Sequence, residues 1–170
     1  MSIMDTLLLL GFPALMAYAA VSDLLTMTIP NRVSLILIAA FLAMSALTGM
    51  PAATIGMHVA AGLLVLLITF SMFALGWIGG GDAKLAAATG VWCGFGVLLD
   101  YALVASVLGG VMTLAILYWR KALLPEFAHR FDWITRLHHA KTGIPYGIAL
   151  AASGLLVYPQ TAVWLRVAGA

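Results

Sequence analysis

The chain has 170 residues, of which 64% are hydrophobic and 8% charged, with a net charge of +2 and a mean hydropathy of +1.12. A soluble domain carries about 25% charged residues, so this composition excludes water as the main solvent. The small net charge, without a clustered basic and aromatic face, also argues against a nucleic-acid binder. We therefore expect an integral membrane protein whose surface faces lipid.

Apolar runs recur along the whole chain, separated by polar, glycine or proline residues. They cover residues 3–21, 33–47, 55–78, 83–99, 101–119 and 144–158. One crossing of the bilayer uses roughly 20 apolar residues, so each run is interpreted as a membrane helix. We predict an all-α fold, a polytopic membrane helical bundle of about six transmembrane helices in a single domain over residues 1–170.

The first run and the boundary between the fourth and fifth runs each have an alternative interpretation. The first run resembles a secretory signal, because residues 17–19 are similar to a small-residue cleavage site. A secretory signal begins with basic residues, and no basic residue precedes this run, so we predict a permanent helix. Between the fourth and fifth runs, only Asp100 and the region of Gly94 and Gly96 interrupt the hydrophobicity. A single bent helix is the alternative there, and it would change the number of crossings.

The positive charges predict the orientation, because Lys and Arg concentrate on the cytoplasmic side of membrane proteins. With about six helices and an external N-terminus, Arg166 is the exception among the eight Lys and Arg residues. The others all fall on the cytoplasmic side: Arg32, Lys84, Arg120, Lys121, Arg130, Arg136 and Lys141. We therefore predict that the N-terminus lies outside.

The longest polar interval covers residues 120–141. Its apolar residues recur at helical spacing: Phe127, Phe131, Ile134 and Leu137. This pattern predicts an interfacial amphipathic helix near residues 125–140, with basic side chains toward the lipid headgroups. Packing on the membrane surface is the main interpretation, and docking of a partner or substrate is the alternative.

Two acidic residues differ from the remaining loop charges. Asp23 closes the first predicted helix in the sequence AVSDLLTMTIPNRVS, and Asp82 follows the third in GWIGGGDAKLAAATG. The predicted topology places both at the cytoplasmic face. If the first and fourth helices pack side by side, the two carboxyl groups reach the same depth.

Paired carboxyl groups suit hydrolysis. Two such groups in a poorly solvated site repel each other when both are ionised, so they share a proton. The ionised group acts as general base on a water molecule, while the protonated group polarises the peptide carbonyl. The pair therefore predicts an aspartyl peptidase that needs neither a metal nor a covalent nucleophile. The alternatives are a helix cap for Asp23 and a loop ion pair between Asp82 and Lys84.

The residues around the two aspartates fit this hypothesis. The glycines at 79–81 let a backbone approach closely, as an extended substrate requires. Pro30 ends the loop after Asp23, and Asn31 is expected to cap the second helix and so fix the direction of Asp23. Gly90 and Gly94 have a GxxxG spacing, which permits tight contact with a neighbouring helix.

Three segments give a family resemblance: DLLTMTIPN at residues 23–31, GGGDAKL at 79–85 and IPYGIAL at 144–150. With them the chain resembles the type IV prepilin peptidases, GxGD membrane aspartyl proteases, especially the short form of tight-adherence (Flp-type) pilus systems. In the family pattern, an aspartate precedes I-P-N and a second belongs to G-x-G-D-x-K. Gly79, Gly81 and Lys84 supply the second motif here. The likeness follows nearly the whole chain in order and length.

The resemblance implies that Asp23 and Asp82 cleave the basic leader from a membrane-embedded prepilin at the cytoplasmic face of the bacterial inner membrane. The partners are then a prepilin and the lipid bilayer, with no cofactor and an oligomeric state that the sequence does not give. Longer relatives also carry a CxxC extension and methylate the new N-terminus. Because this chain has a single cysteine, Cys93, the resemblance implies peptidase activity alone.

The third segment and Lys84 each have two interpretations. Pro145 and Gly147 are expected to free backbone groups that pair with an extended substrate, and the Tyr146 hydroxyl to reach the neighbourhood of the aspartates. The alternative is a proline in the first turn and a tyrosine in the interfacial belt. Lys84 is expected either to tune the carboxyl pair or to bind a headgroup phosphate.

Functions of other classes lack supporting features. An ion-coupled transporter also uses intramembrane carboxylates, but no inverted repeat is visible and the acidic residues lie near the rims. A noncatalytic subunit of a pilus or secretion assembly is the second alternative. Serine chemistry is disfavoured because Ser153 lacks a GxSG context. A metal site is disfavoured because His138 and His139 are adjacent and His58 lies far from the aspartates.

Overall fold

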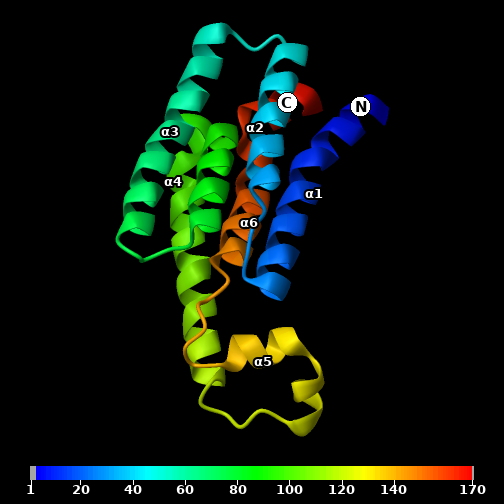
Figure 1. The fold of residues 1–170 in the computed structure, drawn as a ribbon. Coiled ribbons are helices and arrows are strands. Elements are labelled where there is room, and N and C mark those ends of the chain that lie inside the picture. Colours follow the sequence, from blue (N-terminus) through cyan, green and yellow to red (C-terminus); the bar gives the residue numbers. More distant parts are fainter. Residues whose placement is uncertain (1–2, 170) are drawn as a thin grey trace.

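The computed structural model describes residues 3–169, with side chains from residue 9 onward. The elements are α1 (Ile3–Thr26), α2 (Asn31–Leu47), α3 (Ala52–Ala74), α4 (Gly80–Trp119), the 3-10 helix η1 (Glu126–Arg130), α5 (Asp132–His138), α6 (Tyr146–Val157), the 3-10 helix η2 (Tyr158–Gln160) and α7 (Ala162–Ala168). Within residues 3–169 no strand is present. The helices form one bundle, with α5 lying across its lower end (Figure 1). The predicted all-α class is confirmed.

Within the described residues, three helices are long and apolar enough to cross a membrane: α1 over Leu9–Thr26, α3 and α4. The pair Tyr146–Gln160 and Ala162–Ala168, bent by 48°, adds a fourth candidate if it is counted as one span. At 17 residues, α2 is a shorter apolar helix. The exact number of crossings, predicted as about six from the apolar runs, stays a prediction.

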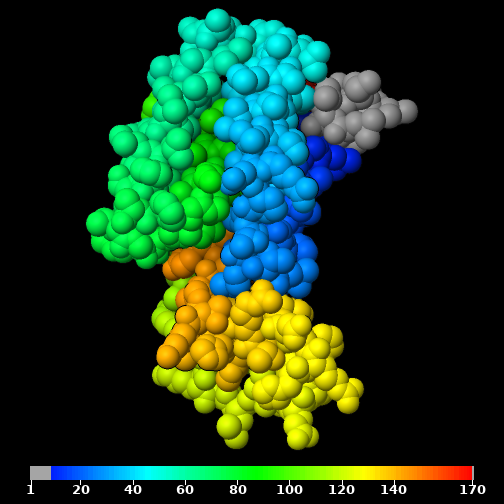
Figure 2. All heavy atoms as spheres, in the orientation of Figure 1, coloured from blue at the N-terminus to red at the C-terminus, as the bar shows by residue number. Residues whose placement is uncertain are grey.

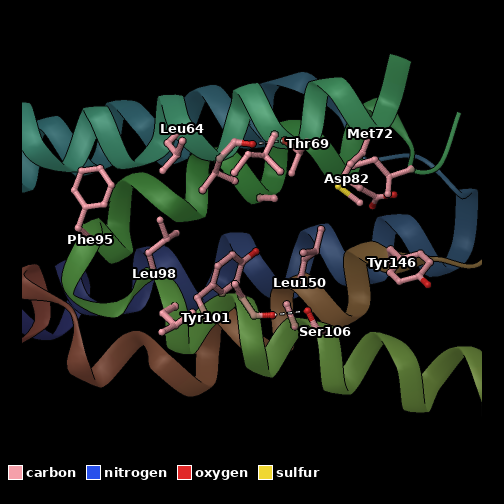
Figure 3. A pocket seen from close by; sticks show the side chains of 17 residues that line it. Leu64, Thr69, Met72, Asp82, Phe95, Leu98, Tyr101, Ser106, Tyr146 and Leu150 are labelled. Atoms are coloured by element: carbon pink, nitrogen blue, oxygen red, sulfur yellow. Dashed lines mark hydrogen bonds between the residues drawn. The ribbon is translucent and has the colours of Figure 1, made fainter. Parts of the chain in front are cut away.

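The 40-residue α4 is divided at Gly94, which has φ 57° and ψ 178°. The chain reverses there, so the first arm (residues 80–93) and the second arm (residues 95–119) run in opposite directions (Figures 1 and 3). Of the two predicted interruptions, the region of Gly94 and Gly96 contains the reversal, whereas Asp100 lies within the second arm, so the predicted bounds 83–99 and 101–119 are displaced. Glycine suits position 94 because a left-handed φ is unfavourable for any residue with a Cβ atom.

His58 of α3 completes this break. The non-helical backbone at Gly94 takes away the helical partner of the Val91 carbonyl, and His58 Nδ1 binds that oxygen at 2.8 Å. The imidazole ring also occupies the place of a side chain at Gly94, since a Cβ there would lie 2.6 Å from His58 Cε1. In hydrocarbon an unpaired backbone carbonyl is costly, so His58 stabilises the reversal.

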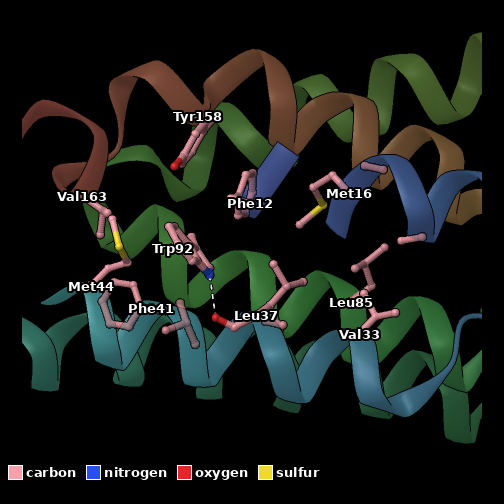
Figure 4. Packing of buried hydrophobic residues seen from close by; sticks show 14 of the residues in the cluster. Phe12, Met16, Val33, Leu37, Phe41, Met44, Leu85, Trp92, Tyr158 and Val163 are labelled. Atoms are coloured by element: carbon pink, nitrogen blue, oxygen red, sulfur yellow. Dashed lines mark hydrogen bonds between the residues drawn. The ribbon is translucent and has the colours of Figure 1, made fainter. Parts of the chain in front are cut away.

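An aromatic cluster holds the helices at a common depth (Figure 4). Trp92 of α4 lies with its ring centroid 4.9 Å from Phe12 of α1 and 5.8 Å from Phe41 of α2. Tyr158 stacks on Phe12 at 4.5 Å. The Trp92 indole N–H donates to the Leu37 carbonyl at 2.9 Å, which joins the first arm of α4 to α2.

The order of packing differs from the expectation. The first and fourth helices were expected to lie side by side, but α1 packs mainly on α6 and α2, while α4 packs on α3, α6 and α2. In Figure 1, α6 lies between α1 and α4. The GxxxG interpretation holds for Gly90, whose Cβ would be 3.0 Å from Val65 of α3; Gly94 instead forms the break.

Residues 120–143 form a layer below the bundle (Figure 2). The predicted interfacial helix is present as two short pieces, η1 and α5, because Phe131 between them has extended backbone angles. Arg120 at the end of α4 donates to the carbonyls of Leu137 (2.8 Å), Thr142 and Gly143 (3.0 Å each). Arg136 donates to the Leu25 carbonyl at 2.9 Å, which ties α5 to the end of α1.

Gly94→Ala tests the reversal. We expect this variant to lose at least about 1–2 kcal/mol of unfolding free energy, because alanine is strained at positive φ and its methyl group meets the His58 ring. Thermal unfolding in detergent, monitored through the labelling of the buried Cys93 as it becomes exposed, measures this loss of stability. Gly96→Ala is the control, since a Cβ at Gly96 meets nothing within 4 Å. Equal stability of the two variants would contradict the role of Gly94.

Candidate active site

Asp23 lies in the last turn of α1 and is 5% exposed. The chain leaves the helix through Met27, which has a left-handed φ of 56° and donates its amide to the Asp23 carbonyl at 2.8 Å. Ser22 Oγ donates to the Thr28 carbonyl at 2.8 Å, so the following loop folds back over the helix end. This loop covers the Asp23 carboxyl from one side.

Asp82 occupies the third position of α4, whose N-cap is Gly79. The backbone amide of Gly79 faces the Asp82 carboxyl, in the manner of an acidic residue at the third helical position that reaches back to the cap. Its Oδ1 atom is buried and has no hydrogen-bond partner among the side chains and backbone that the structure describes. One oxygen of Asp82 is therefore free to act on another molecule.

Gly147 joins the two aspartates. Its amide N–H donates to Asp23 Oδ2 at 2.8 Å and also faces the Asp82 carboxyl. Gly147 is in the first turn of α6, where amides have no partner within the helix. A side chain would not fit, because a Cβ at this position would lie 2.8 Å from Asp23 Oδ2 and 2.6 Å from Ile29 Cδ1. The aspartates thus meet at the start of α6, although α1 and α4 do not pack side by side.

A cavity of about 270 Å³ lies beside the pair. It is lined by Asp23, Met27, Thr28, Ile29, Gly79, Gly80, Gly81 and Asp82. Gly81 lets the loop pass close by, since a Cβ there would approach the Ile29 backbone nitrogen to 3.3 Å. Both carboxyls therefore border one small space framed by the loop after α1 and by the glycine-rich start of α4.

Asn31 and Lys84 have a joint role that the sequence did not predict. The expectation that Asn31 caps α2 is wrong: Pro30 is the N-cap, without a side-chain cap hydrogen bond, and Asn31 begins the helix. Its Oδ1 instead accepts from Lys84 Nζ at 2.9 Å. This bond connects the first turns of α2 and α4 on either side of the cavity. In this structure, Lys84 supports the site from its edge.

Tyr146 differs from expectation as well. Its hydroxyl accepts a hydrogen bond from Thr113 Oγ1 at 3.1 Å, so it binds the second arm of α4 and not the aspartates. Pro145 is the buried N-cap of α6. Gly147 was expected to offer backbone groups to a substrate, but its amide is used by Asp23. The sequence signal for this contact is a glycine in the first turn of a helix, where amide N–H groups attract anions.

The arrangement suits acid–base chemistry. The N-termini of α4 and α6 both face the carboxyl pair, and a helix N-terminus stabilises negative charge. Two ionised carboxylates in one buried site repel each other, which favours a pair that holds one charge and one proton. Such a pair supplies a base and an acid side by side.

A comparison with protein-family models gives one match: the type IV leader peptidase family, over residues 10–114. The matched part contains both aspartates and the glycines at 79–81, and it ends before Tyr146 and Gly147. No curated protein and no solved structure gives a significant match to the chain.

Gly147→Ala tests the junction at the start of α6. We expect a loss of about 1–3 kcal/mol of unfolding free energy, because the added methyl group overpacks the contact with Asp23 and Ile29. The control is Gly143→Ala, where the nearest atom to the new Cβ, Met27 Cε, lies at a relaxed 3.7 Å. If both variants unfold at the same temperature, the close contact at Gly147 is not present in the protein.

Proposed function

The chain belongs to the type IV leader peptidase family, and we propose that it is an intramembrane aspartyl endopeptidase with Asp23 and Asp82 as its catalytic pair. Family membership and the long apolar helices indicate a membrane-embedded peptidase. The aspartyl mechanism is supported by one observation above others: the buried Asp23 carboxyl and the Asp82 carboxyl, whose Oδ1 atom is buried, come from different helices and line the same small cavity.

The chemistry follows from a pair that holds one proton. The ionised carboxylate removes a proton from a water molecule as the water oxygen attacks the carbonyl carbon of the peptide bond. The protonated carboxyl group gives its proton to the carbonyl oxygen, and a neutral tetrahedral intermediate forms. When this intermediate collapses, the C–N bond breaks and the nitrogen leaves as an amine with the proton that the first carboxylate took from water. One hydroxyl of the intermediate returns its proton to the other carboxylate, which restores the pair. The products are a carboxylic acid and a new amino terminus, so atoms and charge balance.

The protein groups around the pair have defined tasks in this proposal. Gly147 holds Asp23 in place through its amide and favours negative charge on the pair. Gly79 and Gly81 keep the cavity open to an extended backbone. The Lys84–Asn31 hydrogen bond fixes the first turns of α2 and α4 relative to each other.

We further propose that the substrate is a type IV prepilin of the Flp-like class, cleaved between its basic leader and its apolar segment. The support is the joint occurrence of the aspartate before I-P-N and of G-x-G-D-x-K at the cavity. The excess of Lys and Arg on the Asp23 and Asp82 side favours a site at the cytoplasmic face of the bacterial inner membrane.

Asp23→Asn and Asp82→Asn test the catalytic pair. Each variant is expected to lower precursor cleavage by about 100-fold or more, because asparagine cannot exchange the proton that the pair must accept and donate. Coexpression with small pilin precursors from the same genome, followed by the mobility shift of the cleaved product, measures the effect.

The matched control is Asp100→Asn. Asp100 is an exposed aspartate on the second arm of α4, outside the cavity, and its replacement is expected to leave cleavage unchanged. Unchanged cleavage by either Asp23→Asn or Asp82→Asn would refute the proposed mechanism. Loss of pilus assembly with cleavage intact would instead indicate a noncatalytic assembly subunit.

A further inference from the structure

A second, larger cavity of about 620 Å³ begins at Asp82. It is a groove between α3 and the two arms of α4, with Tyr146 and Leu150 of α6 at its base (Figure 3). Among the described residues that line it, Asp82 alone is charged. The others are apolar except for four hydroxyl-bearing residues: Thr69, Tyr101, Ser106 and Tyr146. Asp82 therefore borders both the small polar cavity and the apolar groove.

The rim of the groove faces outward. Leu64 is 42% exposed, Phe95 45% and Leu99 68%, so large apolar side chains border the opening. In a membrane these side chains face lipid. An apolar molecule can thus enter the groove sideways from the bilayer and reach Asp82 without crossing an aqueous space.

Tyr101 places a buried hydroxyl group at the groove. Its side chain is 3% exposed, and Figure 3 shows the hydroxyl directed into the space between the arms of α4. Within the described part of the chain, this hydroxyl makes no hydrogen bond. The neighbouring Thr89 hydroxyl donates to the Leu85 carbonyl at 2.9 Å, and its oxygen retains the capacity to accept. A buried polar group without a partner is costly, so an occupant with a polar group would relieve that cost.

We propose that this groove binds the apolar segment of the substrate that follows the cleaved bond, with the Tyr101 hydroxyl hydrogen-bonded to a polar group of that segment. This inference rests on the proposed function. With its cleaved carbonyl at Asp82, a substrate must continue into both cavities. A basic leader cannot enter an apolar groove, so it leaves through the cavity beside Met27 and Gly79, and the apolar segment takes the groove.

The dimensions suit a membrane segment. The groove follows the first arm of α4 from Asp82 to Phe95, which corresponds to about 20 Å at 1.5 Å per helical residue. The groove therefore has the length of about 13 helical residues, and a bound helix would place one face in it. Tyr101 lies between these two ends in Figure 3, so its partner belongs to the middle of the bound segment. A lipid acyl chain would fill the same volume but has no polar group at that depth.

Neighbouring residues on the second arm of α4 supply a matched test. Ala102 lines the groove, whereas Leu103 is 56% exposed and lies outside it. Ala102→Trp should block the groove and lower cleavage of a coexpressed precursor by about tenfold or more, while Leu103→Trp leaves cleavage unchanged. Tyr101→Phe should raise KM about three- to tenfold with kcat little changed, because one hydrogen bond to the bound segment is lost.

Crosslinking keeps this inference separate from the proposed function and from folding defects. In a Cys93→Ala, Asp23→Asn background, which holds the precursor uncut, Ala102→Cys is expected to form a disulfide with a cysteine in the middle of the precursor's apolar segment, and Leu103→Cys is not.

If the parent chain cleaves the precursor but neither cysteine crosslinks, and Ala102→Trp cleaves normally, the groove holds lipid and the inference is wrong. A parent chain that cleaves no precursor overturns the proposed function and this inference together.

Discussion

The hydrogen bond from the Gly147 amide to Asp23 Oδ2 is the contact on which the site depends. It requires α6 to begin between α1 and α4, with a residue at that point that has no side chain. The Asp82 carboxyl borders the same small cavity, so this bond holds Asp23 at the place where the two carboxyls meet. The pair is therefore assembled by the start of a third helix and not by direct packing of the two helices that carry the acids.

The remaining fold keeps this junction in place within a lipid environment. The Trp92 cluster fixes the relative depth of α1, α2 and α4, and His58 binds the carbonyl freed by the reversal at Gly94. Arg120 and Arg136 attach the lower layer to the ends of α4 and α1 through backbone carbonyls. The His58 bond pairs a carbonyl that lipid cannot satisfy, so the break in α4 is tolerated. The same break opens the groove beside Asp82.

The sequence predicted the helical membrane class, both aspartates and the glycines at 79–81, because hydropathy and short motifs are local properties of the chain. It did not predict that α6 packs against both α1 and α4, since apolar runs do not specify their neighbours. The apolar runs were divided at Asp100, with the region of Gly94 and Gly96 as a second interruption, because a charge marks a boundary in hydropathy. The positive φ and the His58 ring, which together require glycine at 94, are properties of the fold. The sequence did not single out Tyr101, because it lies within an apolar run. That its hydroxyl lacks a hydrogen-bond partner follows only from the positions of the described atoms around it.

Paired cysteines test most directly whether the two carboxyl positions meet. In a Cys93→Ala background, Asp23→Cys with Asp82→Cys should be joined by a short bifunctional methanethiosulfonate reagent in the folded protein, with the linked peptides identified by mass spectrometry. Ile29→Cys with Gly81→Cys is the positive control, because a Cβ at Gly81 lies 3.2 Å from the Ile29 Cβ. Asp23→Cys with Asp100→Cys should remain unlinked. A linked control pair together with unlinked cysteines at 23 and 82 would contradict a shared catalytic site.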